Sequence, residues 1–434
     1  MNDSSLSYRP LNLGRWVIWG GTLLLFLVLP LIFKGGFSRT LMAQMGILII
    51  FTLSYNMLLG QSGMLSFGHA VYSGLGAYFA IHALNMIGAG QLVFPVSLLP
   101  LVGGVFGMVF GVLFGYPTTQ KSGTPFAMIT LGIGELVFAC SLMFPGFFGG
   151  EGGISANRTV GGNFLGIKGF NFGPDIQVYY LIAFWCFLSM IAMFAWTHTP
   201  LGRIANAVRD NPERVEFIGY NTQRVRWLVL ILSSFFAGLA GGLSAINFEI
   251  VTAENVSALR SAGVLMAAFI GGMLFFFGPI IGAVVFSFFA IALGDITKAW
   301  LLYLGAFFVL LVMYAPGGLS SLILMNLRVM SFGKMKRLRD PYLGVALSAL
   351  TLLVGLVLVI ELTYHLTLEA AGAATVMVFG FPFDAHSVET WTFVAALVLG
   401  GAGAFEYMRR RFKHEWDAIQ VEMEDWIREN PERA

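Results

Sequence analysis

The chain consists mostly of apolar runs separated by short polar segments. Most runs approach the roughly 20 residues that a straight helix needs to cross a bilayer, and the shorter ones are expected to be tilted or partly inserted. We therefore predict an all-α polytopic transmembrane bundle of about 10–12 spans. The predicted spans lie near residues 17–33, 41–59, 66–87, 93–116, 124–144, 177–197, 227–248, 262–277, 279–296, 298–314, 342–363 and 388–406, with a break at Gly278-Pro279.

One polar segment, residues 199–226, interrupts the apolar pattern with the sequence TPLGRIANAVRDNPERVEFIGYNTQRVR. Pro200 suits the first turn of a helix, and a break is expected at Asn211-Pro212 because proline disfavours the α conformation of the preceding residue. Apolar residues recur at roughly helical spacing, at Ile204, Val208, Val215 and Ile218. The segment is either an amphipathic element that fits a groove on a partner or a solvated loop whose arginines set the topology.

Composition excludes a soluble domain. Hydrophobic residues make up 57% of the 434 positions and charged residues only 11%, against about a quarter charged in a typical soluble domain. The first apolar run lacks the short core and cleavage site of a signal peptide, so we expect it to stay as an anchor. Cys140 and Cys186 fall inside apolar spans, where a buried thiol is expected rather than a disulfide or a metal ligand.

The distribution of Lys and Arg predicts the orientation. If residues 199–226 are cytoplasmic, alternating the spans places most basic residues on that side, as the positive-inside rule requires. The cytoplasmic set contains Arg9, Arg15, Lys121 and the basic residues of 328–340 and 408–416, and the opposite set contains Lys34, Arg39, Arg158, Lys168, Arg260 and Lys298. An even number of spans then puts both termini in the cytoplasm.

Polar residues within or beside spans are the candidates for a substrate path. The glycine-rich run at residues 60–70, GQSGMLSFGHA, suggests non-helical backbone that protein or a wet cavity must satisfy. A helix N-terminus there would suit a substrate carboxylate, and the alternative is a turn whose polar groups bond inside the bundle, which we favour as a structural or inner-gate role. The candidates from this region are Asn56, Gln61, Ser66 and His69.

Glu135 is the only acidic residue well inside a predicted span. Ionisable groups in hydrocarbon are costly, so we expect Glu135 to face the bundle interior with a partner. Its carboxylate either meets the ammonium group of a substrate or is a protonated structural group. Glu249, Glu254 and Asp295 lie near external span ends, where solvation is expected.

Two further features concern packing and the outer surface. Gly103, Gly107, Gly111 and Gly115 recur every four residues, a spacing that lets a neighbouring helix approach closely. Residues 145–175 form a long glycine-rich external loop. Such a loop is expected either to have a function, such as docking a partner or forming an outer gate, or to be a flexible lid.

The run TPLGRIANAVRDNPERVEFIGYN resembles the cytoplasmic coupling loop of permeases in the branched-chain (hydrophobic) amino acid family of bacterial ABC importers. GQSGMLSFGHAVYSGLGAYFA and residues 227–321 are similar to the same family, so the resemblance covers roughly residues 40–325. It divides the chain into an N-terminal region with the first span (1–40), a permease core (41–325) and an extension (326–434). The extension holds two further spans and an amphipathic tail, expected to be cytoplasmic or interfacial.

The resemblance implies a permease subunit in the bacterial inner membrane that pairs with a second homologous permease, two cytoplasmic ATPase subunits and a periplasmic binding protein. The residues that would couple it to the ATPases are Arg203, Ala205, Ala207, Arg209, Asp210, Asn211, Glu213, Arg214 and Gly219. It implies branched-chain or other hydrophobic amino acids as substrates, while similar permeases take urea, short amides or aromatic acids. We also expect the protein to contact membrane lipid and not to bind nucleic acid.

The chain carries no G-x-x-x-x-G-K-[ST] phosphate loop, so ATP is expected to bind to the partner subunits, with no cofactor in this chain. It also carries no H-E-x-x-H motif and no nucleophile elbow, so we predict no catalytic residues, no metal site and no enzyme activity. The alternative class is a stand-alone secondary transporter that is coupled to protons through Glu135. A non-transporting scaffold is disfavoured by the carboxylate and the glycine seams.

Overall fold

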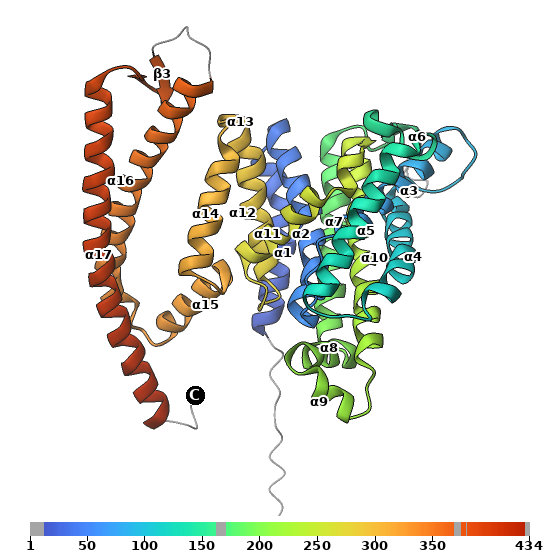
Figure 1. The fold of residues 1–434 in the computed structure, drawn as a ribbon, viewed down its shortest axis with the longest axis horizontal. Coiled ribbons are helices and arrows are strands. Elements are labelled where there is room, and N and C mark those ends of the chain that lie inside the picture. The colour runs from blue at the N-terminus through green and yellow to red at the C-terminus, as the bar shows by residue number, and fades with distance from the viewer. Residues whose placement is uncertain (1–12, 162–170, 369–374, 379, 430–434) are drawn as a thin grey trace, which may run out of the picture. The chain divides into compact units, whose positions relative to one another are not determined.

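The computed structural model describes residues 13–161, 171–368, 375–378 and 380–429 and is predominantly helical (Figure 1). Within this described part, nine helices are long and apolar enough to cross a membrane, or ten if one bent pair counts as a span. The predicted polytopic helical bundle is therefore confirmed. The predicted span at 262–277 is a shorter apolar helix instead, Ala258–Gly271.

The chain forms two compact units. Unit 1 comprises the residues up to Leu293 together with Ala306–Ser320, and unit 2 comprises Gly294–Gly305 and Ser321–Ala434. The elements up to residue 293 are α1 (Leu13–Ile32), α2 (Gly36–Ser62), α3 (Ala70–Gly88), η1 (Val96–Leu98), α4 (Leu99–Thr118), α5 (Thr124–Met143), α6 (Pro145–Phe148), η2 (Gly150–Gly152), β1 (Ile154–Ser155), η3 (Arg158–Gly161), α7 (Asp175–Thr197), α8 (Pro200–Asp210), α9 (Pro212–Phe217), α10 (Thr222–Phe248), β2 (Ile250–Val251), η4 (Ala253–Val256), α11 (Ala258–Gly271), α12 (Gly278–Ser287) and the π-helical η5 (Phe288–Leu293).

The remaining elements follow in chain order. They are α13 (Gly294–Ile296), α14 (Trp300–Tyr314), α15 (Gly318–Ser331), α16 (Met335–Leu368), β3 (Thr375–Val378), β4 (Phe381–Asp384) and α17 (Val388–Glu429). The predicted break lies just before Gly278-Pro279, at residues 272–277 between the end of α11 and the start of α12, and not at the two residues themselves. With 14 residues, α11 is about 21 Å long, less than the roughly 30 Å of a bilayer core.

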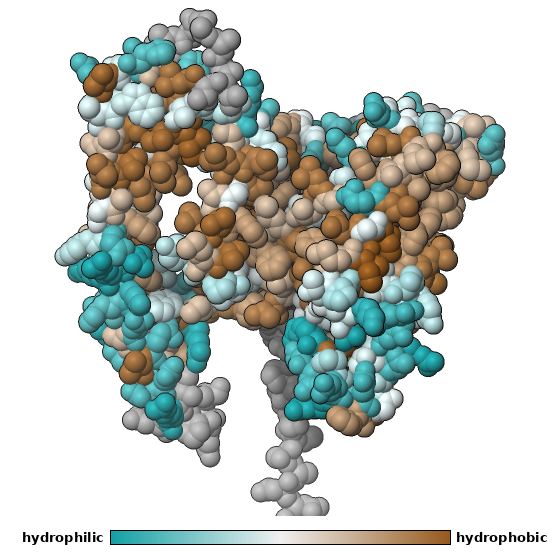
Figure 2. All heavy atoms as spheres, in the orientation of Figure 1, coloured by the Kyte–Doolittle hydropathy of each residue, from teal (hydrophilic) through white to brown (hydrophobic). Residues whose placement is uncertain are grey.

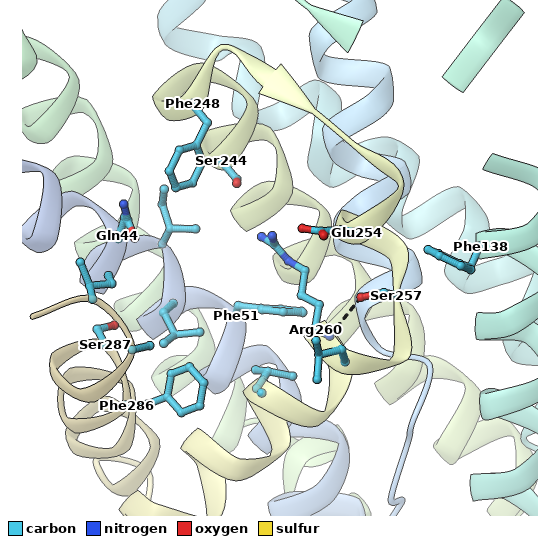
Figure 3. A pocket seen from close by; sticks show the side chains of 17 residues that line it. Gln44, Phe51, Phe138, Ser244, Phe248, Glu254, Ser257, Arg260, Phe286 and Ser287 are labelled. Atoms are coloured by element: carbon cyan, nitrogen blue, oxygen red, sulfur yellow. Dashed lines mark hydrogen bonds between the residues drawn. The ribbon is translucent and has the colours of Figure 1, made fainter. Parts of the chain in front are cut away.

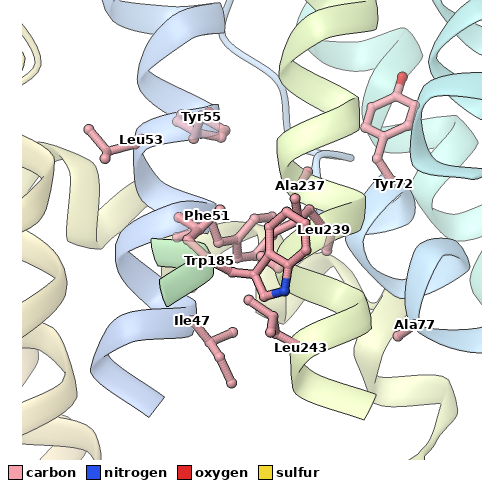
Figure 4. Packing of buried hydrophobic residues seen from close by; sticks show 14 of the residues in the cluster. Ile47, Phe51, Leu53, Tyr55, Tyr72, Ala77, Trp185, Ala237, Leu239 and Leu243 are labelled. Carbon is pink, nitrogen blue, oxygen red and sulfur yellow. The ribbon is translucent and has the colours of Figure 1, made fainter. Parts of the chain in front are cut away.

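Helix α10 lies at the centre of unit 1 and packs against α2, α3 and α4, while α7 packs on α2. The core between them is built from large apolar side chains, among them Ile47 and Phe51 of α2, Trp185 of α7 and Leu243 of α10 (Figure 4). The buried indole of Trp185 donates to the carbonyl oxygen of Ser97, at 2.9 Å. This satisfied donor lets a large aromatic side chain fill the core without an unpaired polar atom.

The predicted glycine ridge on α4 is the contact surface for α10. A Cβ atom at Gly103 would lie 2.5 Å from the carbonyl oxygen of Gly238, and one at Gly107 would lie 2.8 Å from the Cα atom of the same residue. A Cβ atom at Gly111 or Gly115 would instead meet the side chains of Ser234 and Leu230. Larger side chains at Gly103 and Gly107 would push the two helices apart, since the obstructing atoms there are backbone.

The end of unit 1 opposite α8 and α9 carries an ordered part of the external loop. Strands β1 and β2 pair antiparallel, with Ile154 opposite Val251. Arg158 joins the loop to neighbouring segments through donations to the carbonyl oxygens of Asn247 and Phe172 and an ion pair of 3.3 Å with Asp175. The described portion of the loop is therefore held against the core by hydrogen bonds. This differs from the flexible lid that the sequence analysis considered as one alternative. Residues 162–170 lie outside the described residues.

Unit 2 is a long helical hairpin in which α16 packs against α17. The last predicted span and the amphipathic tail form one continuous helix, α17. Its buried residues Ile419 and Met423 pack with Val329 and Leu338. Arg337 makes ion pairs of 2.9 Å with Glu415 and 2.8 Å with Glu422, and Lys334 also pairs with Glu422. The apolar face of the tail is thus covered within the extension itself.

Candidate functional site

Helices α8 and α9 form the polar end of unit 1, where hydrophilic residues gather below the apolar helices (Figure 2). Each helix start is capped by a side chain. The backbone amide of Gly202 donates to the hydroxyl of Thr199 at 3.3 Å, and that of Arg214 donates to the Asn211 side chain at 3.0 Å. The predicted pair of short helices with a break at Asn211-Pro212 is confirmed, since Asn211 both ends α8 and caps α9.

The two short helices have an inner and an outer face. Ala205, Val208 and Val215 are buried, and α8 contacts α2, α7 and α10. The predicted coupling residues on the exposed side are Arg203, Ala207, Asp210, Asn211, Glu213, Arg214 and Gly219. Two large apolar side chains that we did not select are also uncovered, Phe217 at 89% exposure and Ile218 at 67%. The sequence could have identified them, because they form an apolar pair directly after a charged helix.

Arg209 does not belong to the outer face. Its Nη1 atom donates to the carbonyl oxygen of Gly60 in the last turn of α2, and its Nε atom donates to Asp210 at 2.9 Å. Gly63, the C-cap of α2, has a φ of 71°, and a Cβ atom there would lie 2.9 Å from Cγ of Arg209. Gly63 is therefore required both by its backbone conformation and by the approach of Arg209.

A polar hollow of about 560 Å³ lies beside α9. Its lining includes Gln120, Glu216, Tyr220 and Arg226. The hydroxyl of Thr222 donates to Glu216 at 2.7 Å and fixes one wall. Together with exposed Phe217, the hollow gives this end of the molecule the mixture of apolar and polar groups found at protein interfaces.

The segment between α2 and α3, residues 63–69, is non-helical and lies inside the protein, as predicted. Two of its backbone groups bond to side chains of neighbouring helices. The amide of Phe67 donates to the hydroxyl of Thr130 at 3.2 Å, and the hydroxyl of Tyr55 donates to the carbonyl oxygen of Ser66 at 2.9 Å. Irregular backbone is tolerated here because protein groups replace its helical hydrogen bonds.

His69 is fully buried at the end of this segment. Its Nε2 atom lies 3.0 Å from the hydroxyl of Ser54, and its ring stacks on Phe51 with a centroid distance of 5.6 Å. Within the described residues, three buried polar atoms of the predicted substrate-path residues have no partner: Oδ1 of Asn56, Oγ of Ser66 and Nδ1 of His69. Gln61 is also buried, in the last turn of α2. The aromatic packing favours the structural interpretation of this run.

Glu135 lies elsewhere than predicted. It is exposed on α5, next to exposed Gly132 and Leu136, and does not face the interior of the bundle. The expectation of an interior partner is wrong because α5 is an edge helix, with only a third of its apolar window buried, and hydrophobicity alone did not reveal which face packs. A role for Glu135 in the substrate path remains a prediction.

An apolar cavity of about 490 Å³ opens between α2, α10, α11 and α12, with Phe138 of α5 at one side (Figure 3). Aliphatic and aromatic side chains form most of its wall, among them Ile47, Phe51 and Phe248. Phe51 connects the cavity to the buried junction, because its ring also stacks on His69.

Two opposite charges enter this cavity, Glu254 from η4 and Arg260 from α11 (Figure 3). The hydroxyl of Ser257 accepts from the backbone amide of Arg260 at 3.2 Å, and Asn255 accepts from its Nη1 atom at 2.5 Å. Figure 3 shows the guanidinium and the carboxylate directed toward the same space. The expected solvation of Glu254 near an external span end is confirmed, because the residue is exposed, and the tertiary structure places it with Arg260 in the lining of one cavity.

Comparison with known proteins agrees with this architecture. A family model described as the branched-chain amino acid transport system permease component matches residues 38–317. The permease protein LivM of the high-affinity branched-chain amino acid transport system of Escherichia coli (strain K12) is 29% identical over 294 residues, 63% of this chain and 67% of the relative. The fructose import permease protein FrcC of Rhizobium meliloti is 26% identical over 231 residues, 49% of this chain and 61% of the relative.

No solved structure matches the chain significantly. The family match covers unit 1 from residue 38 onward, without α1, and includes the α2–α3 junction, the α8–α9 pair and the charged apolar cavity. It ends before the helical hairpin of unit 2. Such permeases are membrane components of transport systems and not enzymes. The chain is a multi-pass membrane protein that belongs to the branched-chain amino acid transport permease family.

Proposed function

We propose that this permease is the transmembrane subunit of an ATP-driven importer for branched-chain or other hydrophobic amino acids, located in the bacterial inner membrane with both termini in the cytoplasm. One observation carries the proposal: the α8–α9 pair is bonded to the core on one side, through Arg209 and Gly60, and open on the other side, around Phe217. An element with these two faces can receive a partner and transmit its movement to the spans.

The proposed assembly contains a second homologous permease, two cytoplasmic ATPase subunits that bind the ATP, and a periplasmic binding protein. The ATPases would contact the exposed residues of α8 and α9 and the polar hollow beside them. The binding protein would contact the opposite end of unit 1, where Arg158 holds the β1–β2 segment in place. The names of the LivM relatives support branched-chain amino acids as substrates. Because a fructose permease is also among the relatives, the substrate has to be tested directly.

The test is to purify the chain with its candidate partners and reconstitute it in proteoliposomes. We expect ATPase subunits to co-purify and leucine uptake to require ATP together with the binding protein. Uptake that follows a proton gradient without ATP would instead establish the stand-alone secondary transporter. Competition by unlabelled valine, urea, acetamide or benzoate then identifies the substrate class.

A further inference from the structure

We infer that the cavity between α2, α10, α11 and α12 is the permease's own binding site for an apolar amino acid in its zwitterionic form. The substrate carboxylate would meet Arg260, its ammonium group would meet Glu254, and its side chain would lie against the apolar wall. This inference rests on the proposed importer function and assigns the residues that recognise the substrate.

The two charges are the first argument. Glu254 and Arg260 line the same apolar cavity, yet no ion pair joins them among the described residues. Arg260 is partly buried against the apolar wall, where its guanidinium group requires a counter-charge, and Glu254 lines the same cavity from an exposed position. A bound zwitterion would supply a carboxylate to Arg260 and an ammonium group to Glu254.

The second argument is that hydrogen bonds hold Arg260 in position. Ser257 caps its helix and Asn255 holds one of its guanidinium nitrogens, which leaves the other N–H groups for a ligand. The guanidinium group is planar and suited to bidentate binding of a carboxylate. A positioned arginine therefore favours a carboxylate over a neutral amide.

The wall and the volume are the third argument. Ile47, Leu48, Val264 and Ile291 offer aliphatic surface, and the cavity of about 490 Å³ falls within the roughly 300–1,000 Å³ of small-ligand sites. Urea and short amides carry no charges that could pair with Arg260 and Glu254. Benzoate has a carboxylate but no ammonium group, so Glu254 would repel it. A hydrophobic amino acid satisfies both charges and the wall.

The experiment uses the full permease complex with its ATPase subunits in nanodiscs, without the binding protein, and measures binding of radiolabelled leucine by scintillation proximity. Arg260→Gln and Glu254→Gln should each weaken leucine binding by about tenfold or more. Lys34→Gln and Glu151→Gln are matched controls that remove the same charges outside the cavity and should bind leucine like wild type.

A second readout separates recognition from a structural effect. In Glu254→Gln, 4-methylpentanoate, which is leucine without its amino group, should compete better relative to leucine than it does in wild type. Ala290→Trp, which fills the cavity and keeps both charges, should also abolish leucine binding while the complex still assembles. Equal leucine binding by wild type and both charge variants overturns the inference, as does absence of binding to a wild-type complex that transports leucine. A complex without ATPase subunits or uptake overturns the proposed function instead.

Discussion

The guanidinium group of Arg209 in α8 donates a hydrogen bond to the carbonyl oxygen of Gly60 in the last turn of α2. Three residues later, Gly63 gives the side chain room to reach that carbonyl. This bond joins the two stretches that resemble the transporter family in sequence, although 149 positions separate them. A movement of α8 therefore acts directly on the end of α2. The non-helical segment and His69 come next in the chain.

The first prediction concerns this bond. Arg209→Ala should leave ATPase subunits bound but reduce uptake per ATP hydrolysed about tenfold, because a hydrogen bond from a charged donor contributes about 1.5–3 kcal/mol. Uptake and ATP hydrolysis are measured together in proteoliposomes. Arg339→Ala, which removes an exposed arginine of α16 that also pairs with the following aspartate, is the matched control and should keep uptake per ATP unchanged. Loss of the ATPase subunits from the Arg209 variant would show that its role is docking.

The second prediction concerns the outer face. Phe217→Asp should weaken ATPase association by about 2 kcal/mol or more, because large exposed apolar side chains at protein interfaces dominate binding. Co-purified ATPase is quantified after affinity capture of the permease. Val421→Asp, a similar change at an exposed position of α17, should retain the ATPase. Equal capture by the two variants would contradict the assignment of this surface.

The third prediction concerns the α4–α10 seam. Gly107→Ala should destabilise the protein by about 1–3 kcal/mol, because the added methyl group meets the backbone of α10. The apparent melting temperature in detergent measures the effect. Gly132→Ala on α5, where nothing lies within 4 Å of the new Cβ atom, should leave that temperature nearly unchanged. A stable Gly107 variant would mean that the two helices separate easily.

The fourth prediction concerns the external end. The backbone amide of Arg158 donates to Glu249 at 2.7 Å, and its side chain donates to several carbonyl oxygens. Arg158→Ala removes the side-chain donors and leaves these acceptors unsatisfied, at about 1–3 kcal/mol each. Faster hydrogen exchange is expected around residues 154–158 and 249–251 but not in α8. Unchanged exchange would argue that β1–β2 pairing alone holds the loop.

The fifth prediction concerns Glu135. Because it is exposed on α5 and outside the apolar cavity, Glu135→Gln should keep most ATP-dependent uptake and should not change its response to a proton gradient. Uptake at two external pH values with ATP held constant is the measurement. Selective loss of gradient-dependent uptake in this variant would revive the proton-coupled alternative.

Local chemistry in the sequence was sufficient for most of the architecture. The apolar runs predicted a helical membrane protein, and Pro200 and Asn211-Pro212 predicted the boundaries of α8 and α9. The four-residue spacing from Gly103 to Gly115 predicted the face of α4 that packs on another helix. Each of these features depends on residues a few positions apart, whose conformational or packing preference is the same in any context.

Only the tertiary structure decided which faces meet. Helix α5 is apolar nearly all round and does not reveal its buried side, so the outward direction of Glu135 was not available from the pattern. The bond from Arg209 to Gly60 was not available either, because its acceptor lies 149 positions away in the chain. Glu254 is exposed near a span end, as expected, and only the packing of α2, α10, α11 and α12 places it with Arg260 in the lining of one cavity. The physical reason is that their surroundings come from segments distant in the chain, and an isolated charge acquires its role from the groups packed around it.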